Sequence, residues 1–311
     1  MNCKKKSISV VIVNWNAGQL LAECVDSVLV YGSGLIGKII IVDNGSIDGS
    51  LELLPPDPNL LIIRTGKNLG FGKACNLGSK LSDSEYILFL NPDCRLFKNT
   101  LTQIEELINN KPEIGVYGVQ LIDEQNKVSK SCARFPDLMC YIYQSLGLSR
   151  LAFFKKYDMH MSDWAHDQDC IVDHVIGAFY LIRASLYESV NGFDERFFVY
   201  LEDLDLSRRV VQAGHSIYYA ASIQAFHAGG GTSRQVKAYR LFYSLRSRIQ
   251  YAFKHFTTFS AICVLTVTIL IEPISRIVLC TVRRDVQGIS NTIKAYLLLL
   301  RDMPKFLTRG K

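Results

Sequence analysis

The chain has 311 residues, of which 49% are apolar and 21% are charged. This composition excludes a disordered or collagen-like protein, and the length is typical of about two domains. None of the nine cysteines belongs to a Cys-x-x-Cys pair. A disulfide scaffold and a zinc ribbon are therefore disfavoured, and a reduced, cytoplasmic protein is expected.

The net charge of +6 hides an asymmetry along the chain. Residues 1–231 carry a net charge of −5, whereas residues 232–311 carry +11. We therefore expect a globular domain over residues 1–235 and a basic, apolar, helical C-terminal region over residues 236–311. Such an asymmetry indicates that the C-terminal region binds either a nucleic acid or an anionic membrane surface.

Two apolar segments need to be distinguished from targeting or membrane-spanning sequences. Ile8–Val13 follows three lysines but is shorter than the core of a secretion signal, so we interpret it as a buried strand. Phe256–Ile271 is uncharged, but Glu272 and Arg276 interrupt the apolar run that follows it. A membrane span needs about 20 apolar residues, so a helix in the membrane interface is favoured. The alternative is a helix packed on its own domain, and the sequence leaves open whether residues 256–282 lie on, span or avoid a membrane.

Strand and helix patterns alternate through the first part of the chain. The expected strands are Ile8–Val13, Ile39–Val42, Leu60–Arg64 and Tyr86–Leu90, and the expected helices are Leu20–Leu29, Phe71–Leu81 and Leu101–Asn109. Thr100 is expected to cap the last of these helices. The alternation predicts an α/β fold with a mainly parallel sheet flanked by helices. In such folds ligands bind beyond the carboxyl ends of the strands.

Asp43 stands directly after one of these strands. Its carboxylate could accept hydrogen bonds from a nucleobase or a ribose. Asn14 and Asn16, at the end of the preceding strand, are further candidates for binding this ligand. The structural alternative is a turn built on Asn-Gly and Asp-Gly, in which Asp48 caps the next helix.

A glycine-containing turn precedes the second expected helix. Asn68, Gly70, Gly72 and Lys73 could hold a diphosphate at the helix N-terminus. Cys75 stands where a dinucleotide fingerprint has its third glycine, so the evidence for a nicotinamide cofactor is weak. A tight turn without a ligand is the alternative.

Asn91-Pro92-Asp93 ends the fourth expected strand. Asp93 could hold Mg²⁺ or Mn²⁺ against phosphate oxygens, although Asn-Pro also initiates turns. His227 precedes a run of glycines, which gives the backbone unusual conformational freedom. A metal or phosphate partner is therefore more plausible for this histidine than for a lone histidine elsewhere.

Glu202, Asp203 and Asp205 place three carboxylates within four residues. Mutual repulsion raises carboxyl pKa values, which suits a general base. Acids also favour a helix N-terminus through the helix dipole, and both explanations can hold together.

In this order, the motifs resemble the family 2 glycosyltransferases of the GT-A fold, especially their rhamnosyltransferase-like branch. The resemblance covers about residues 7–235 and is carried by the segments at residues 11–16, 42–46, 68–72, 90–93, 177–179, 192–198 and 202–205, together with His227. It implies that Asp43 recognises the pyrimidine of a sugar nucleotide and that Asp203 is the catalytic base. Glu202 and Asp205 are implied to position either this base or the acceptor. Asn91 and Asp93 occupy the two ends of the metal-binding Asp-x-Asp motif, but Asn91 replaces the first aspartate. His227 matches a later metal-binding histidine.

The resemblance implies an inverting transferase at the inner face of the cell membrane. The expected donor is a dTDP- or UDP-sugar, with rhamnose preferred, and the expected acceptor is a lipid-linked or polysaccharide hydroxyl. The side of the site that binds the acceptor is expected to include Arg134–Pro136 and residues 158–173. A nucleotide-sugar or dinucleotide oxidoreductase and a nucleic-acid-binding protein are the alternatives. A membrane surface is favoured over nucleic acid as the partner of the basic region.

Overall fold

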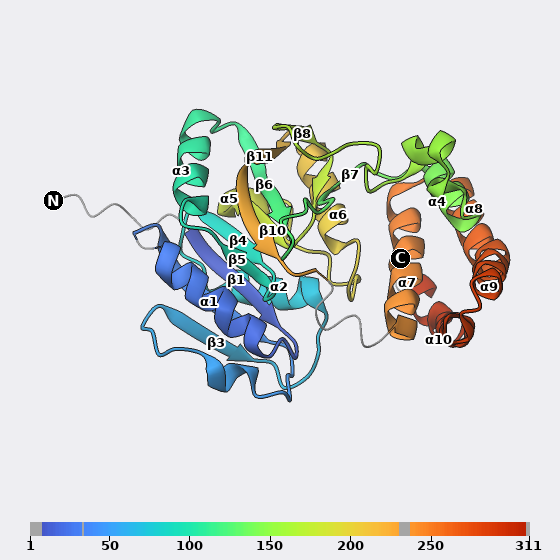
Figure 1. Ribbon diagram of the computed structural model, residues 1–311, viewed down its shortest axis with the longest axis horizontal. Coiled ribbons are helices and arrows are strands. Elements are labelled where there is room, and N and C mark those ends of the chain that lie inside the picture. Colours follow the sequence, from blue (N-terminus) through green and yellow to red (C-terminus); the bar gives the residue numbers. More distant parts are fainter. Residues whose placement is uncertain (1–7, 33, 230–236, 309–311) are drawn as a thin grey trace. The chain divides into compact units, whose positions relative to one another are not determined.

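The computed structural model describes residues 8–32, 34–229 and 237–308, which form two compact units (Figure 1). The three lysines near the N-terminus, the glycines at 230–231 and the expected boundary at residue 235 lie outside the described residues. The first unit comprises residues 1–133, 165–196 and 202–232. The second comprises residues 134–164, 197–201 and 233–311.

A mixed sheet forms the centre of the first unit. Its strand order is β3-β2-β1-β4-β10-β6-β11-β5, with β8 paired to β11. The strands are β1 (Ile8–Asn14), β2 (Ile36–Asp43), β3 (Leu60–Arg64), β4 (Tyr86–Leu90), β5 (Cys94–Leu96), β6 (Ile114–Ile122), β8 (Cys170–Val172), β10 (Phe179–Arg183) and β11 (Ser216–His227). β1 to β4 are mutually parallel, β6 is parallel to β11, and β10 runs antiparallel between β4 and β6. This sheet confirms the expected α/β fold.

Alternate residues of the central strands face helices on opposite sides of the sheet. Ile8, Val10 and Ile12 share a core with Leu21 and Val25 of α1 (Gln19–Tyr31). On the other face, α2 (Phe71–Ser79) packs closely, because a Cβ on Gly78 would lie 2.6 Å from Cγ1 of Val11. These strands are buried on both faces, which accounts for their nearly continuous apolar sequences.

Further helices complete the first unit: α3 (Thr100–Asn110), α5 (Ala184–Ser189), α6 (Glu202–Gln212) and the short 3-10 helix η1 (Ser50–Leu53). The expected cap at Thr100 is wrong. Asn99 is the N-cap residue of α3, and the Thr100 hydroxyl instead accepts from the Phe97 N–H and donates to the carbonyl of Gln224 on β11. Thr100 therefore ties the start of α3 to a strand distant in sequence.

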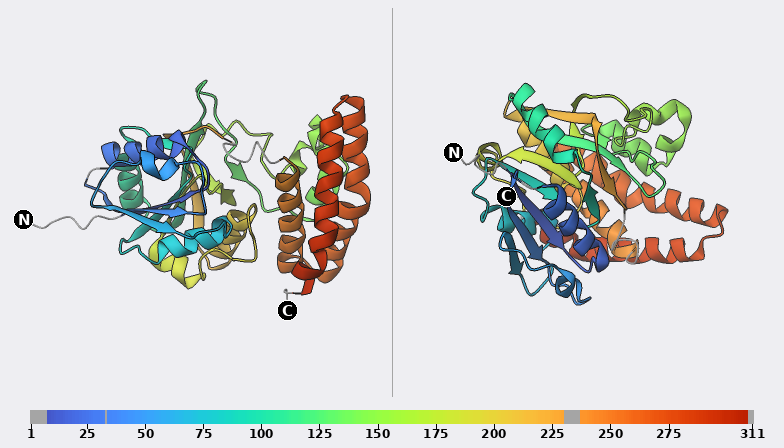
Figure 2. Two further views of the ribbon diagram at one scale, coloured as in Figure 1. Left: turned by 90° about the horizontal axis from the view of Figure 1, so that it is seen from below. Right: turned by 60° about the vertical axis from the view of Figure 1, so that its left-hand side comes forward.

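Helices make up most of the second unit. They are α4 (Leu138–Ser145), the 3-10 helices η2 (Leu148–Arg150) and η3 (Ala152–Tyr157), α7 (Lys237–His255), α8 (Thr258–Thr266), the π-helical turn Val267–Ile271, α9 (Glu272–Val282) and α10 (Val286–Thr308) (Figure 2). Phe242, Leu245 and Ile249 of α7 pack against Tyr296 and Leu299 of α10. The structure thus groups residues 134–164 with the C-terminal helices, which the sequence patterns did not indicate.

Candidate active site

The first group of expected site residues lies where β1 and β2 end. These parallel strands pair Asn14 with Asp43, and the Asn14 amide donates to Oδ1 of Asp43 at 3.0 Å. The same amide lies 3.0 Å from the hydroxyl of Ser46 and 2.8 Å from that of Ser50. These contacts hold the Asp43 carboxylate in a defined position at the carboxyl ends of the parallel strands.

Asn16 and Asp48 shape the loops around Asp43. Oδ1 of Asn16 accepts from the Ile47 N–H at 2.9 Å, and the Asp48 carboxylate accepts from the Gly18 and Ser50 N–H groups. Burial opposes ionisation of Asp48, but these hydrogen bonds outweigh it and lower the pKa of the carboxyl group. The expected cap at Asp48 is wrong, because Gly49 is the N-cap residue of η1; Asp48 instead binds the N–H and hydroxyl of Ser50, the first residue of that turn.

The glycine-containing turn is held to the Asp43 loop by Asn44. The Asn44 amide donates to Oδ1 of Asn68 at 3.0 Å, and that oxygen also accepts from the Gly70 N–H. Gly70 has φ +90°, a conformation that favours glycine. Asn68 thus sets the entry into α2.

Two residues expected to bind the diphosphate have structural contacts of their own. A Cβ on Gly72 would lie 3.0 Å from Cβ of Phe193, so this glycine permits close packing of α2. Nζ of Lys73 lies 3.1 Å from a carboxylate oxygen of Glu195. Binding of a donor phosphate by Lys73 would therefore compete with an exposed ion pair, which costs little to break.

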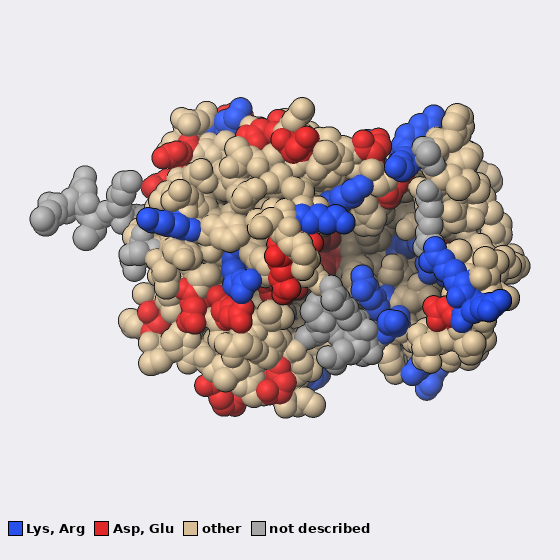
Figure 3. All heavy atoms as spheres, viewed as in Figure 1, with Lys and Arg blue, Asp and Glu red and all other residues tan. Residues whose placement is uncertain are grey.

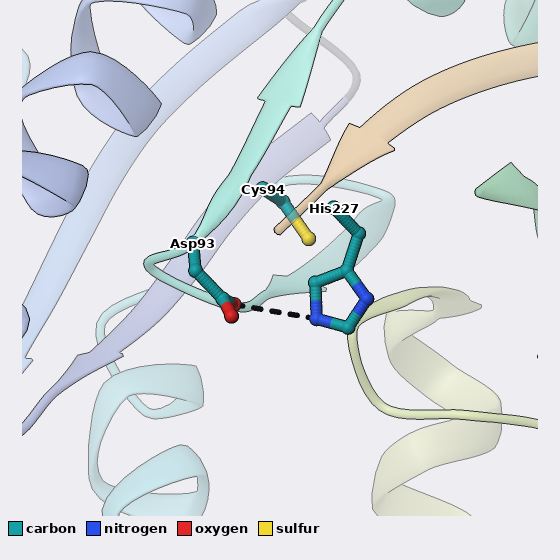
Figure 4. Close-up of side chains that lie close together, drawn as sticks. All are labelled: Asp93, Cys94 and His227. Carbon is teal, nitrogen blue, oxygen red and sulfur yellow. Dashed lines mark ion pairs between the residues drawn. The ribbon is translucent and has the colours of Figure 1, made fainter. Parts of the chain in front are cut away.

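Asp93, in the turn directly before β5, and His227, at the end of β11, meet at one place (Figure 4). The antiparallel pairing of β5 and β11 sets His227 opposite Cys94, and Nε2 of His227 lies 3.3 Å from Oδ1 of Asp93. The Asp93 carboxylate offers the oxygen ligand that Mg²⁺ and Mn²⁺ prefer, and the His227 imidazole offers a nitrogen ligand beside it. Asn91, the other end of the motif, accepts at its carbonyl from the Cys94 N–H.

Cys94 completes this cluster geometrically but does not suit a hard metal ion. Its sulfur lies within 4.8 Å of the Asp93 and His227 ligand atoms. Burial, followed by the charge of Asp93, raises the pKa of the thiol, and the S–H donates to the Ala178 carbonyl at 3.2 Å. Cys94 is therefore a neutral thiol with a structural hydrogen bond.

The three acidic residues of α6 occupy three different environments. Asp203 retains partial exposure, and Oδ2 accepts from the Gly177 N–H at 2.8 Å while Oδ1 accepts from its neighbour, the Leu204 N–H. Glu202 is buried, and its Oε2 has no hydrogen-bond partner among the described residues. Burial, followed by the charge of Asp203, raises the pKa of Glu202 well above its usual value. The buried position therefore favours the protonated form of Glu202.

Asp205 is fully buried and pairs with Arg209 at 2.9 Å. Arg209 also donates to the Val190 carbonyl, so the pair anchors α6 to the loop after α5. Asp205 therefore helps to fix the helix that carries Asp203.

Residues 177–178 connect the expected base to the expected metal ligands. The Gly177 N–H binds Asp203, while the Ala178 carbonyl accepts from the Asn91 N–H and the Cys94 thiol. This segment immediately precedes β10, which pairs with β4 through Phe179 and Leu90. The sheet therefore brings together residues more than 100 positions apart.

Several site residues were not among those expected from the sequence. Ser46, Ser50 and Gly177 hold the side chains of Asn14 and Asp203. Ser46 stands in the same conspicuous turn as Asp43, so that motif could have identified it. Of the residues expected on the acceptor side, Arg134–Pro136 line a small surface pocket with Lys156–Met159. His166 instead packs in the core of the first unit beside Tyr219.

Comparison with solved structures defines the class of fold. The chain is similar to a mannosyltransferase from Pyrobaculum calidifontis in complex with GDP-Man and Mn²⁺, with 15% identity, a TM-score of 0.57, and coverage of 96% of this chain and 89% of that one. It is also similar to GalNAc-T7 with UDP, GalNAc and Mn²⁺, with 14% identity, a TM-score of 0.54, and coverage of 81% and 51%. These similarities establish a GT-A-like fold.

Sequence comparison identifies the family. The model of glycosyl transferase family 2 matches residues 9–170, and the chain belongs to that family. It is 27% identical to the N-acetylglucosaminyl-diphospho-decaprenol L-rhamnosyltransferase of Mycobacterium tuberculosis, over 61% of this chain and 66% of that protein. It is 30% identical to rhamnosyltransferase WbbL of Escherichia coli, over 55% and 62%. The matched regions thus span just under two thirds of these relatives.

Proposed function

We propose that this protein is an inverting glycosyltransferase that moves rhamnose from a nucleoside-diphosphate donor to a hydroxyl of a lipid-linked or polysaccharide acceptor. The observation that carries the proposal is the arrangement around residues 177–178. The partly exposed carboxylate of Asp203 accepts from the Gly177 N–H, and the next residue, Ala178, accepts from Asn91 and Cys94, which flank Asp93 of the Asp93–His227 pair. The names of the two rhamnosyltransferase relatives support the choice of sugar and acceptor.

The residues divide the reaction between them. Asp43 is assigned to the nucleobase of the donor. The rest of the nucleotide is assigned to Asn14, Asn16, Asn68, Gly70, Gly72, Lys73 and Asn91. A divalent cation held by Asp93 and His227 would neutralise the departing diphosphate. Asp203 removes the proton of the acceptor hydroxyl as that oxygen bonds to the anomeric carbon and the carbon–oxygen bond to the diphosphate breaks. One such displacement inverts the anomeric configuration.

We also propose that the protein acts at the inner face of the cell membrane, attached by its C-terminal helices. Residues Thr258–Val282 form one helical stretch that is long and apolar enough to cross a membrane, which by itself is weak evidence. One face of this stretch is buried in its own unit through Ala261, Val264, Thr268 and Glu272. Glu272 is paired there with Arg248 and Arg276. A helix with one face committed to such a network suits a position in the interface rather than a span.

The opposite face of these helices is apolar and exposed. α8, the π-helical turn and α9 expose Phe259, Ile262, Leu270, Ile274, Val278 and Val282, and α10 exposes Val286, Ile293, Leu297 and Leu300. Lys and Arg predominate among the visible charges of this unit (Figure 3). An apolar face accompanied by basic residues favours an anionic lipid surface.

A donor screen tests the transferase proposal. The purified protein is heated with Mn²⁺ and each of several nucleoside-diphosphate sugars, and dTDP-rhamnose should raise the melting temperature most. A ligand present at 100 times its Kd stabilises the folded state by about 2.7 kcal/mol. Stabilisation by NAD and by no sugar nucleotide would instead support the oxidoreductase alternative.

A further inference from the structure

A buried histidine lies directly behind Asp203. His174 belongs to β9 (His174–Val175), and its Nε2 lies 3.7 Å from Oδ2 of Asp203, the oxygen that also accepts from the Gly177 N–H. The histidine is 3% exposed, so it does not reach solvent or an acceptor. His174 can therefore influence the site through its interaction with the Asp203 carboxylate.

The other ring nitrogen of His174 connects to a chain of hydroxyl groups. Nδ1 lies 2.8 Å from the hydroxyl of Ser207 on α6, and that hydroxyl lies 3.2 Å from the hydroxyl of Tyr180 on β10. Ser207 and Tyr180 are both fully buried. Burial raises the pKa of Tyr180, with the charge of Asp203 adding to it, so the phenol keeps its proton.

When the imidazole is neutral and Asp203 is ionised, only one direction of donation satisfies this chain. If Tyr180 donates to Ser207 and Ser207 donates to Nδ1, then Nε2 carries the ring proton and directs it at the carboxylate. In the opposite direction, an unprotonated Nε2 would face a carboxylate oxygen, and two lone pairs would oppose each other. The distance of 3.7 Å is longer than a hydrogen bond, so the attraction is electrostatic in this conformation.

We propose that His174 is a positioning residue for the catalytic base, held by Ser207 and Tyr180 as the neutral tautomer whose Nε2–H faces Asp203. This rests on the proposed role of Asp203. Together with the Gly177 N–H, the imidazole orients Oδ2 and stabilises the anionic carboxylate before the acceptor hydroxyl arrives. The other ionisable groups near this chain are Glu202, whose pKa is raised chiefly by burial, and the Asp205–Arg209 pair.

Nitrogen NMR of the full chain labelled with ¹⁵N-histidine tests the geometry without any substrate. The chain contains six histidines, and the signal lost in His174→Gln identifies His174. We expect a neutral ring protonated at Nε2, and we expect its shifts to change in Asp203→Asn. A ring protonated at Nδ1, or shifts unaffected by Asp203→Asn, would overturn the proposal whether or not the protein transfers sugar.

Kinetics separates positioning from a merely structural role. Misplacing a reacting group by about 1 Å can cost about 100-fold in rate. We expect His174→Phe to lower kcat by about 10- to 100-fold with donor KM nearly unchanged, and to move the acid-side loss of activity to higher pH. His174→Gln, whose amide can still donate, should recover much of the rate. Equal losses in both variants with an unchanged pH profile would contradict the proposal. If His174→Phe does not fold, the same comparison is made with Ser207→Ala. That substitution removes the hydrogen bond to Nδ1 of His174.

Discussion

Oδ1 of Asp93 and Nε2 of His227 lie 3.3 Å apart although 134 residues separate them along the chain. The pairing of β5 with β11 produces this contact, because it sets His227 opposite Cys94. Asp93 directly precedes β5 and His227 ends β11, so the two side chains face each other, as two ligands of one cation must.

Removal of either side chain should therefore weaken metal binding. We expect Asp93→Ala and His227→Ala each to reduce Mn²⁺ affinity at least about 10-fold, measured by titration calorimetry, and a chelator to stop transfer by the native enzyme. Cys94→Ser is the matched control, because this thiol donates to the Ala178 carbonyl and should be dispensable for the metal. Undiminished transfer in excess chelator would refute the metal role.

Asp203→Asn should abolish transfer and leave donor binding nearly intact. The amide retains the shape of the carboxylate but cannot take the acceptor proton, and loss of a general base typically costs about 100- to 10,000-fold. Single-turnover transfer and donor titration measure the two effects separately. Glu106→Gln, an exposed acid on α3, serves as the control. A variant at Asp203 with full activity would remove this residue as the base.

Glu202→Gln should reduce the loss of folding stability that a rise in pH causes. The folded-state pKa of Glu202 is raised, chiefly by burial, so the folded state retains a proton that the unfolded chain loses above about pH 4.4. Stability of the native protein should therefore fall as the pH rises through this range. Urea unfolding at pH 5 and pH 8 should show a smaller difference for Glu202→Gln than for the native chain. An identical difference in both would show that Glu202 is ionised when folded.

The buried pair of Arg248 and Glu272 should be essential to the second unit. Both side chains are nearly inaccessible, and removal of one member of such a pair leaves an uncompensated charge, which typically costs about 3–5 kcal/mol. We expect Glu272→Gln to lower the unfolding midpoint of this unit, followed by circular dichroism. Arg283→Gln, on an exposed arginine, should not change it.

The same pair gives the second unit an acid-sensitive stability. Burial opposes ionisation of Glu272, but Arg248 and Arg276 outweigh it and lower the pKa of the carboxyl group. Because the folded-state pKa lies below the unfolded value, the stabilisation is complete above about pH 4.4 and is lost as the pH falls below it. Glu272→Gln should lack this loss between pH 5 and pH 3.

The apolar face of α9 and α10 should bind anionic vesicles. Replacing Ile274 and Leu297 together with serine removes two side chains that are 63% and 64% exposed, so flotation with phosphatidylglycerol vesicles should fall severalfold. Val30→Ser, at a side chain 65% exposed on α1, is the control. Vesicles of phosphatidylcholine alone should bind less of the native protein. Binding to an oligonucleotide but not to vesicles would favour the nucleic-acid alternative.

The local pattern of the sequence was sufficient to predict the central strands. β1, β2 and β4 are largely buried on both faces, so their sequences are rich in apolar residues, and each apolar run is followed directly by a polar residue. Asn14, Asp43 and Asn91 could therefore be placed at the carboxyl ends of neighbouring strands before the sheet order was known. The expected α/β fold and the family resemblance were both confirmed.

What only the tertiary structure decided concerns contacts between segments distant in sequence. The burial of Glu202, the placement of His174 behind Asp203, and the bond from Thr100 to Gln224 depend on which strands and helices become neighbours. The same is true of Glu272, which interrupts an apolar run in the sequence but meets Arg248 across the helical unit. Burial and alternation act between near neighbours in the chain and so leave a local pattern. The environment of a carboxylate depends on side chains supplied by other elements, and no local pattern encodes it.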